Sequence, residues 1–341
     1  MSTRKITRAA VTSCLITLVA STFSGSVPSR ATSLSFGWTT PTSLPAPRSS
    51  AAVAVGHDGN IYVFGGTNGE TEDYNSVFIY HPRSNAWSMG ATMPFAVEGN
   101  AAVTLPDGRI MVMGGGTGCH NTQQCTTYKT VEVYDPKLHS WCLLAPMRTS
   151  HYRFPAVLGP DGRVYAIGGW DGREAIATVE AYNIRANTWT TVTSLPQAEE
   201  SAAAVVIRHR IAVVGGFDGS FAASGGGTFY NNLFVYDGKT WESGSPMPTP
   251  RAQLAAGVGP QGLIFAMGGY APRRYLSTVE AYNPQSDTWS NKPPLPKPLA
   301  IFGAAMTADG RIYTFGGWDG APSTQVAVYG TRAARHNPFT N

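Results

Sequence analysis

Short apolar runs recur along the chain, and six of them end in a pair of glycines. At 61–66, 110–115, 164–169, 211–216, 264–269 and 312–317 the sequence reads IYVFGG, IMVMGG, VYAIGG, IAVVGG, IFAMGG and IYTFGG. A second small-apolar run comes before each of them, and in four units the turn between the two runs contains Asp-Gly. Two apolar runs around a tight Asp-Gly turn are typical of a β-hairpin. The pattern therefore predicts many short antiparallel strands.

Each glycine pair is followed by a variable loop, a strand-like run that ends in Tyr, and a further run that carries a Trp. The tyrosines are Tyr80, Tyr134, Tyr182, Tyr236, Tyr282 and Tyr329, and the tryptophans are Trp87, Trp141, Trp189, Trp241 and Trp289. A Pro-rich link then leads to the next unit. One unit of four short strands cannot bury its own faces, and stacking such sheets around an axis gives a β-propeller.

The two ends of the repeat complement each other. The last unit has Gly316, Gly317 and Tyr329 but no Trp after them, whereas the stretch FGWTTPTSLP at 36–45 has Trp38 without a preceding glycine pair. We therefore predict an N-terminal strand that completes the final blade and closes a ring of six. Closure removes the free strand edges that promote aggregation.

The order Gly-Gly, Val-Glu-x-Tyr, Trp at a period of about 50 residues resembles the kelch repeat. GGWDGREAIATVEAYNIRANTW at 168–189 and GGYAPRRYLSTVEAYNPQSDTW at 268–289 are the most similar to it, and the resemblance covers residues 34–330. It implies an all-β, six-bladed kelch-type β-propeller whose outermost strand is exchanged between the termini. It implies no single activity, because one fold supports many functions.

The N-terminal residues differ in character from the repeats. MSTRKITRAA is basic, VTSCLITLVA is apolar, and STFSGSVPSRA is small and polar. This order is typical of a secretory signal peptide. We expect a signal peptide at 1–31, the propeller at 32–331 and a short polar tail at 332–341, and hence a secreted protein or one on the periplasmic or envelope exterior.

Composition and charge exclude several classes of function. With 25 Lys and Arg against 21 Asp and Glu, and no basic stripe, the chain shows no nucleic-acid footprint. No stretch after the leader is long and apolar enough to span a membrane. The sequence has no G-x-S-x-G, H-E-x-x-H or P-loop motif, and its histidines are too scattered for a copper centre. We expect a monomer without metal or cofactor.

Three cysteines remain after the leader. Cys119 and Cys125 close a short loop, and an exported protein meets an oxidising compartment, so we predict a disulfide between them. A metal site of Cys119, His120 and Cys125 is the competing interpretation, although thiolate zinc sites normally need four ligands. Cys142 follows a Trp and is expected to be a buried small hydrophobe.

The Pro-rich links supply the candidate binding residues. Aligned on the strand that follows, Arg48, His151 and Arg251 share one column, and Glu98, Tyr152 and Glu199 share the next, with Arg153 beside them. Arg273 lies in the loop after the fifth glycine pair. Such a ring of mixed charge at a channel mouth suits a polar ligand, with guanidinium groups on carboxylate or phosphate. The competing interpretation is that these residues cap strand ends and pair with one another.

We therefore expect a protein- or glycan-binding module that uses the face with the links and the loops after each Gly-Gly. Protein or peptide partners come first and acidic carbohydrate second. The alternative is an acid/base enzyme, because the chain also resembles the exported six-bladed sialic acid mutarotases. That chemistry needs a carboxylate beside an Arg, such as Glu98 or Glu199 with Arg153 or Arg251. The GGWDG motifs at 168–172 and 316–320 are assigned to the scaffold, with packing roles for Trp170 and Trp318.

Overall fold

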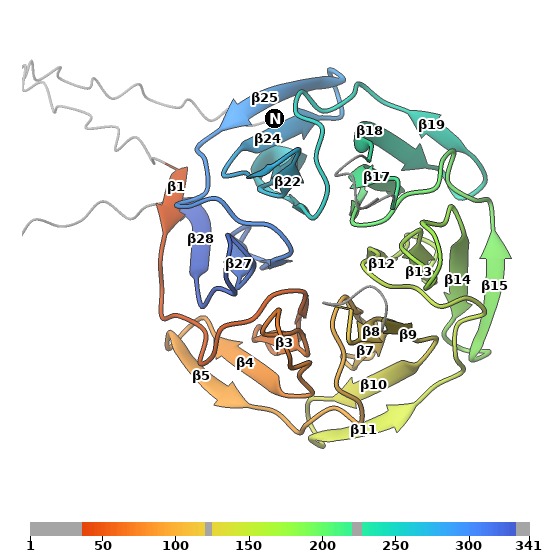
Figure 1. The fold of residues 1–341 in the computed structure, drawn as a ribbon, viewed down its shortest axis with the longest axis vertical. Helices are drawn as coiled ribbons and strands as arrows, with labels where there is room; N and C mark the ends of the chain where they lie inside the picture. The colour runs from red at the N-terminus through yellow and green to blue at the C-terminus, as the bar shows by residue number, and fades with distance from the viewer. Residues whose placement is uncertain (1–35, 120–124, 220–226, 332–341) are drawn as a thin grey trace, which may run out of the picture.

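The computed structural model describes residues 36–119, 125–219 and 227–331. Six four-stranded antiparallel sheets are arranged radially around one axis, and the chain passes from blade to blade around the ring (Figure 1). The predicted six-bladed propeller is confirmed. The predicted signal peptide at 1–31 and tail at 332–341 lie outside the described residues, so these boundaries stay predictions. In the part of the chain that the structure describes, no helix is long and apolar enough to cross a membrane.

Every blade has the same strand order from the axis outward. The innermost strands are β2 (Ala52–Val55), β6 (Ala101–Thr104), β12 (Ala156–Leu158), β16 (Ala203–Ile207), β20 (Ala255–Val258) and β26 (Gly303–Met306). The second strands are β3 (Ile61–Phe64), β7 (Ile110–Met113), β13 (Val164–Ile167), β17 (Arg210–Phe217), β21 (Ile264–Met267) and β27 (Ile312–Phe315). The third strands are β4 (Val77–His81), β10 (Val131–Asp135), β14 (Val179–Asn183), β18 (Phe229–Tyr236), β24 (Val279–Asn283) and β28 (Val326–Thr331).

The fourth, outermost strands carry the tryptophans. They are β5 (Ala86–Met89), β11 (Ser140–Leu143), β15 (Thr188–Val192), β19 (Trp241–Ser243), β25 (Thr288–Lys292) and β1 (Phe36–Thr39). Two small hairpins stand on the loops after the glycine pairs, β8 (Gly116–Thr117) with β9 (Thr126–Thr127) and β22 (Tyr270–Ala271) with β23 (Arg274–Tyr275). In the fifth blade a 3-10 turn, η1 (Pro260–Gly262), stands in place of the Asp-Gly hairpin turn.

The N-terminal strand closes the ring as predicted. β1 pairs with β28 in the last blade, so that the first and last strands of the colour ramp lie side by side (Figure 1). Trp38 lies opposite Tyr329, the register that Trp87 and Tyr80 have in the first blade. The Trp38 indole donates a hydrogen bond to Pro293 O of the preceding blade (2.9 Å), as Trp141 does to Ala91 O. The exchanged strand thus reproduces the contacts of a normal blade.

The core consists of six apolar clusters that lie mostly between neighbouring blades. The second strands are buried on both faces, which explains their continuous apolar runs. The glycine pair that follows each of them adopts positive φ, for example 57° at Gly168 and 95° at Gly169. A Cβ on Gly169 would lie 2.7 Å from Phe154 Cβ. The pair is therefore needed for backbone conformation and close packing, as predicted for a scaffold element.

Candidate functional site at the axial mouth

The links and the loops after the glycine pairs meet on one face of the propeller. The second glycine of each pair donates its backbone N–H to the first link residue of the following blade, at 2.8–3.0 Å. These bonds define equivalent positions in the six links. The first positions are Arg48, Val97, His151, Glu199, Arg251 and Leu299. The alignment of Glu199 with Glu98 and Tyr152 was therefore wrong by one residue: Glu200 is their equivalent, and its bridge to Phe217 matches the bridge from Glu98 to Gly116.

The third link positions form a continuous ring of hydrogen bonds around the axis. Each backbone N–H donates to the carbonyl of the same position in the preceding blade, at 2.7–2.9 Å, and the sixth bond closes the circle. The members are Ser50, Gly99, Arg153, Ser201, Gln253 and Ile301, all with φ between 45° and 63°. These hydrogen bonds fix the backbone of the six link residues at the mouth of the axial channel. They therefore also fix the positions from which the side chains of these residues extend.

Three predicted ligand-binding residues turn away from the mouth into their blades. The Arg48 guanidinium donates to Gly65 O (2.8 Å) and stacks over Phe78 (4.0 Å to the ring centroid). His151 Nδ1 bonds Gly168 O (2.7 Å), and its Nε2 lies 3.3 Å from Glu180. Their positions support the competing interpretation, in which link residues cap strand ends.

Arg251 shows this structural role most clearly. Its Nη2 bonds Glu280 Oε2 at 2.8 Å and Ala266 O at 3.2 Å, and the side chain is fully buried. Burial lowers the pKa of Arg251 to about 10, although Glu280 opposes this shift. In the third and fifth blades, the Glu of the Val-Glu-x-Tyr strand is thus the partner of the link residue, His151 and Arg251 respectively.

A cavity of about 260 Å³ opens at the mouth, above the hydrogen-bonded ring. Glu98, Arg153 and Gln253 supply its charged and amide groups. Tyr270, Tyr275 and Trp318, from the fifth and sixth blades, supply its aromatic side chains. Tyr270 and Tyr275 pack with their ring centroids 5.2 Å apart. The site therefore combines polar groups of the second, third and fifth blades with aromatic groups of the fifth and sixth.

Glu98 is the buried carboxyl group of this cavity. It is only 1% exposed, and its Oε1 has no hydrogen-bond partner among the described residues. Burial raises the pKa of Glu98, and the nearby Asp73 adds to the shift, while Arg153 and the Ser50 and Tyr152 hydroxyl groups oppose it. An unpartnered buried carboxyl group that lines a cavity is suited to bind a ligand or to exchange a proton.

Arg153 interacts electrostatically with two carboxyl groups. Burial opposes its charge, but Tyr152, Glu98 and Glu200 together raise the pKa of Arg153, so it stays cationic. Its guanidinium carbon lies 5.0 Å from the Tyr152 ring centroid. Burial also raises the pKa of Glu200; Arg153 opposes that shift and Asp218 adds to it.

The remaining predicted site residues do not line the cavity. Tyr152 is buried, and its hydroxyl group acts on the Glu98 carboxyl group. Glu199 accepts hydrogen bonds from Gln197 and Asn232, and burial raises its pKa to about 8. Arg273 is exposed in the turn between β22 and β23. Of the predicted ligand-binding residues, only Glu98 and Arg153 meet in the cavity.

Sequence reasoning missed Gln253 and the cavity role of Trp318. Trp318 also covers Gly69, where an added Cβ would lie 2.1 Å from the indole ring, so its assignment to packing was incomplete. The signal for Gln253 was present, since it occupies the same link position as Arg153. Trp170 packs against Tyr152 with their ring centroids 6.2 Å apart.

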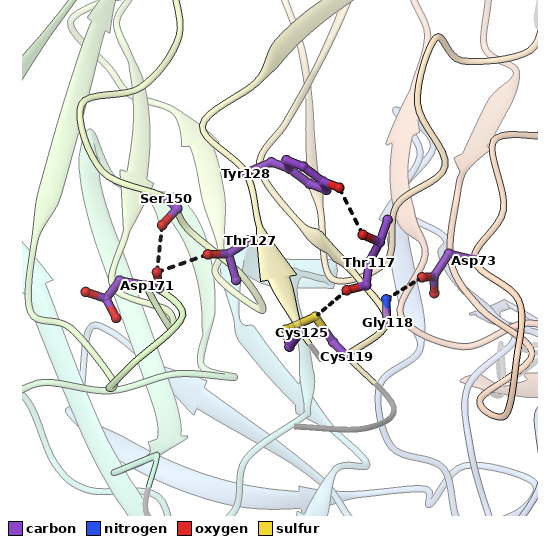
Figure 2. The surroundings of a disulfide bond; sticks show 9 residues. All are labelled: Asp73, Thr117, Gly118, Cys119, Cys125, Thr127, Tyr128, Ser150 and Asp171. Atoms are coloured by element: carbon purple, nitrogen blue, oxygen red, sulfur yellow. Dashed lines mark hydrogen bonds between the residues drawn. A yellow bond between two sulfur atoms is a disulfide. The ribbon is translucent and has the colours of Figure 1, made fainter. Parts of the chain in front are cut away.

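The predicted disulfide between Cys119 and Cys125 is present beside the mouth (Figure 2). Its hairpin is held from both sides: the Asp73 carboxylate accepts from the Gly118 amide (2.8 Å), and Thr127 Oγ1 donates to Asp171 O (3.0 Å). The disulfide uses both thiols that the competing metal site would need. Across the described residues, no group of three or more His, Cys, Asp and Glu side chains is placed to hold a metal ion.

Cys142 is exposed, so its predicted burial was wrong. It lies on β11, the outermost strand of the second blade. Strand alternation turns the neighbouring Trp141 toward Phe64 of the first blade (5.8 Å between ring centroids), and Cys142 therefore faces the other way, into solvent.

Comparisons with known proteins agree with this architecture. The Kelch motif model matches residues 48–94 and 99–148, and the KLHDC2/KLHL20/DRC7 Kelch-repeats domain model matches 148–317. Kelch-like protein 25 of Xenopus tropicalis is 28% identical over 251 residues, which cover 72% of this chain and 40% of that protein. Kelch-like protein 40 of Mus musculus is 32% identical over 206 residues, 58% of this chain and 32% of that protein. The chain thus spans well under half the length of these relatives.

The solved structure of YjhT superposes with a TM-score of 0.71 at 16% identity, covering 85% of this chain and 97% of that one. At this identity the likeness concerns the fold. The matches of the family models across 48–317, the Trp and Tyr register repeated in every blade, and the exchanged outer strand agree with one another. The chain belongs to the kelch-repeat β-propeller family.

Proposed function

We propose that this kelch propeller is a binding module that takes part of a protein or peptide partner into the axial mouth. The cavity carries this proposal, because it combines a buried carboxyl group, a guanidinium group and an amide with three aromatic rings. Ligand sites are typically apolar concavities of about 300–1,000 Å³ with a few well-placed polar groups. A cavity slightly smaller than that range suits one side chain of a partner that rests on the surrounding loops.

Selection of peptides from a display library against the full chain tests this function. Tyr275→Ala removes one ring of the cavity, and Leu138→Ala is the matched control because Leu138 is 73% exposed in the turn between β10 and β11, at the opposite end of its blade. We expect selected peptides to lose affinity for Tyr275→Ala and to keep it for Leu138→Ala. Peptides that depend on Leu138, or on neither residue, would contradict the proposed site.

The second candidate function is acid/base catalysis on an acidic sugar. The observation in its favour is Glu98, whose pKa is raised by burial and which shares the cavity with Arg153. Turnover of N-acetylneuraminic acid anomers, followed by NMR, separates the two functions. An enzyme loses its rate in Glu98→Gln, whereas a binding module shows no rate above that of the buffer.

We further propose that the protein is exported. The N-terminal sequence pattern supports export, and so does the Cys119–Cys125 disulfide, because such bonds persist in oxidising compartments. N-terminal sequencing of the protein recovered outside the cytoplasm is expected to begin at Thr32. A start at Met1 would contradict cleavage.

A further inference from the structure

The charged groups at the axial mouth are mostly acidic, which the sequence did not predict. Arg48, His151 and Arg251 are bound to partners inside their blades, so they are removed from the mouth. What remains around the cavity is Arg153, together with the carboxyl groups of Glu98 and Glu200 that interact with it. Asp73 acts electrostatically on Glu98, and Asp218 acts on Glu200. Acidic groups therefore outnumber the one cation at this site: two carboxyl groups act on Arg153, and two more act on those carboxyl groups.

The aromatic side chains complement this acidic environment. Tyr270, Tyr275 and Trp318 line the same cavity as Glu98. Aromatic faces attract organic cations, and the attraction is stronger where water is excluded. An unpartnered carboxylate oxygen that is buried is a strong acceptor for an ammonium or guanidinium group.

The exposed charged side chains on the loops around the cavity do not change its acidic character. Arg273 and Arg274 stand on the β22–β23 hairpin, outside the cavity lining, and both are exposed. Glu70 and Glu72 are exposed on the loop of the first blade. Solvent and salt screen such surface charges strongly. The buried groups therefore determine which ligand the cavity selects.

We infer that the axial mouth selects a cationic group, namely the ammonium or guanidinium group of a Lys or Arg side chain, which Glu98 binds between the aromatic rings of the fifth and sixth blades. This inference rests on the proposed binding function and specifies the charge of its ligand. It reverses the expectation that guanidinium groups of the links hold an acidic ligand.

Titration of Glu98 gives a second, independent signature. The groups that act on its carboxyl are Arg153, Asp73 and the Ser50 and Tyr152 hydroxyl groups. A carboxyl group with a raised pKa must release its proton to bind a cation. Affinity for a cationic ligand should therefore increase as the pH rises through that pKa, with uptake of the ligand accompanied by proton release.

Calorimetric titration of the full chain with four N-acetylated, C-amidated pentapeptides tests the inference. Each peptide has a central Lys, Arg, norleucine or Glu between pairs of glycines, and n-butylammonium serves as a free cation. We expect the Lys and Arg peptides to bind at least about tenfold more tightly than the other two, from the strength of charged hydrogen bonds. Glu98→Gln should abolish this preference, and Glu174→Gln, an exposed carboxyl on the same face, should keep it.

The other possible outcomes separate failure of cation recognition from failure of the proposed peptide-binding function. Preference for the Glu peptide that disappears in Arg153→Met overturns cation recognition and leaves peptide binding intact. Binding of n-butylammonium without any peptide supports cation recognition but overturns the peptide function. Failure of every probe overturns both. If Glu98→Gln does not fold, wild-type affinity for the Lys peptide that does not increase as the pH rises above the ordinary glutamate pKa overturns the inference.

Discussion

Glu132 should destabilise the folded protein at neutral pH, and its removal should therefore stabilise it. Glu132, Glu180 and Glu280 occupy the same position in the Val-Glu-x-Tyr strands of three blades. Glu280 is paired with Arg251, whereas Glu180 lies 3.3 Å from His151 Nε2 and accepts from the Arg148 and Thr149 amides. Glu132 has no such cation, because its blade carries Val97 at the link position.

The magnitude follows from the pKa of this carboxyl group. Glu132 is 4% exposed, its Oε2 has no hydrogen-bond partner among the described residues, and burial raises its pKa from 4.5 to about 7. Below pH 4.5 the group is protonated in both the folded and the unfolded protein and has no effect. Between pH 4.5 and 7 only the unfolded state ionises, so stability falls as the pH rises. The loss reaches at most about 3 kcal/mol above pH 7.

Urea unfolding followed by tryptophan fluorescence from pH 4 to pH 8 measures this effect. Glu132→Gln should gain up to about 3 kcal/mol relative to wild type between pH 4 and pH 8, on top of any pH-independent difference between the two side chains. Glu180→Gln is the control, and we expect its stability relative to wild type to change with pH in the opposite direction. Burial opposes the charge of Glu180, but its hydrogen bonds outweigh burial and lower its pKa. A stability difference between Glu132→Gln and wild type that does not change with pH would refute the reasoning.

Three further predictions follow from the contacts of the fold. Arg251→Ala should cost about 3–5 kcal/mol of stability, because it leaves the Glu280 carboxylate buried without its cation; urea unfolding measures this, and a loss of peptide affinity at unchanged stability would contradict its structural role. Replacing both Cys119 and Cys125 by Ala should cost about 2 kcal/mol from the entropy of a seven-residue loop, measured as a lower unfolding midpoint; an unchanged midpoint would refute it. Deleting residues 36–44 removes β1 and exposes the edge of β28, so the product should aggregate, which size-exclusion chromatography would show. A soluble truncated chain that unfolds cooperatively would refute ring closure by β1.

The fold could be predicted from the sequence because its signals are repeated. Six glycine pairs fix the period, and the missing Trp of the last unit matches the surplus Trp38 at the start. The same register of Trp and Tyr in every blade means that one correct blade determines the others.

The candidate site could be predicted only in part. Links at the mouth were located correctly, but the direction of each side chain depends on a partner far away in the sequence. Arg251 turns into its blade because it pairs with Glu280, which lies 29 residues further along the chain. The consecutive glutamates Glu199 and Glu200 allowed two alignments, and the hydrogen bond from Gly169 to Glu199 O and the bridge between Glu200 and Phe217 distinguish them. Trp318 could not be assigned to the cavity because it packs over Gly69, which belongs to another blade.

A crystal structure of the full chain with the Lys pentapeptide tests the central claim most directly. We predict that the peptide lies on the face of the links, with the lysine ammonium group bonded to Glu98 and its side chain between Tyr275 and Trp318. A peptide bound on the outer strands or at the opposite face, or a lysine side chain directed away from Glu98, would contradict the account.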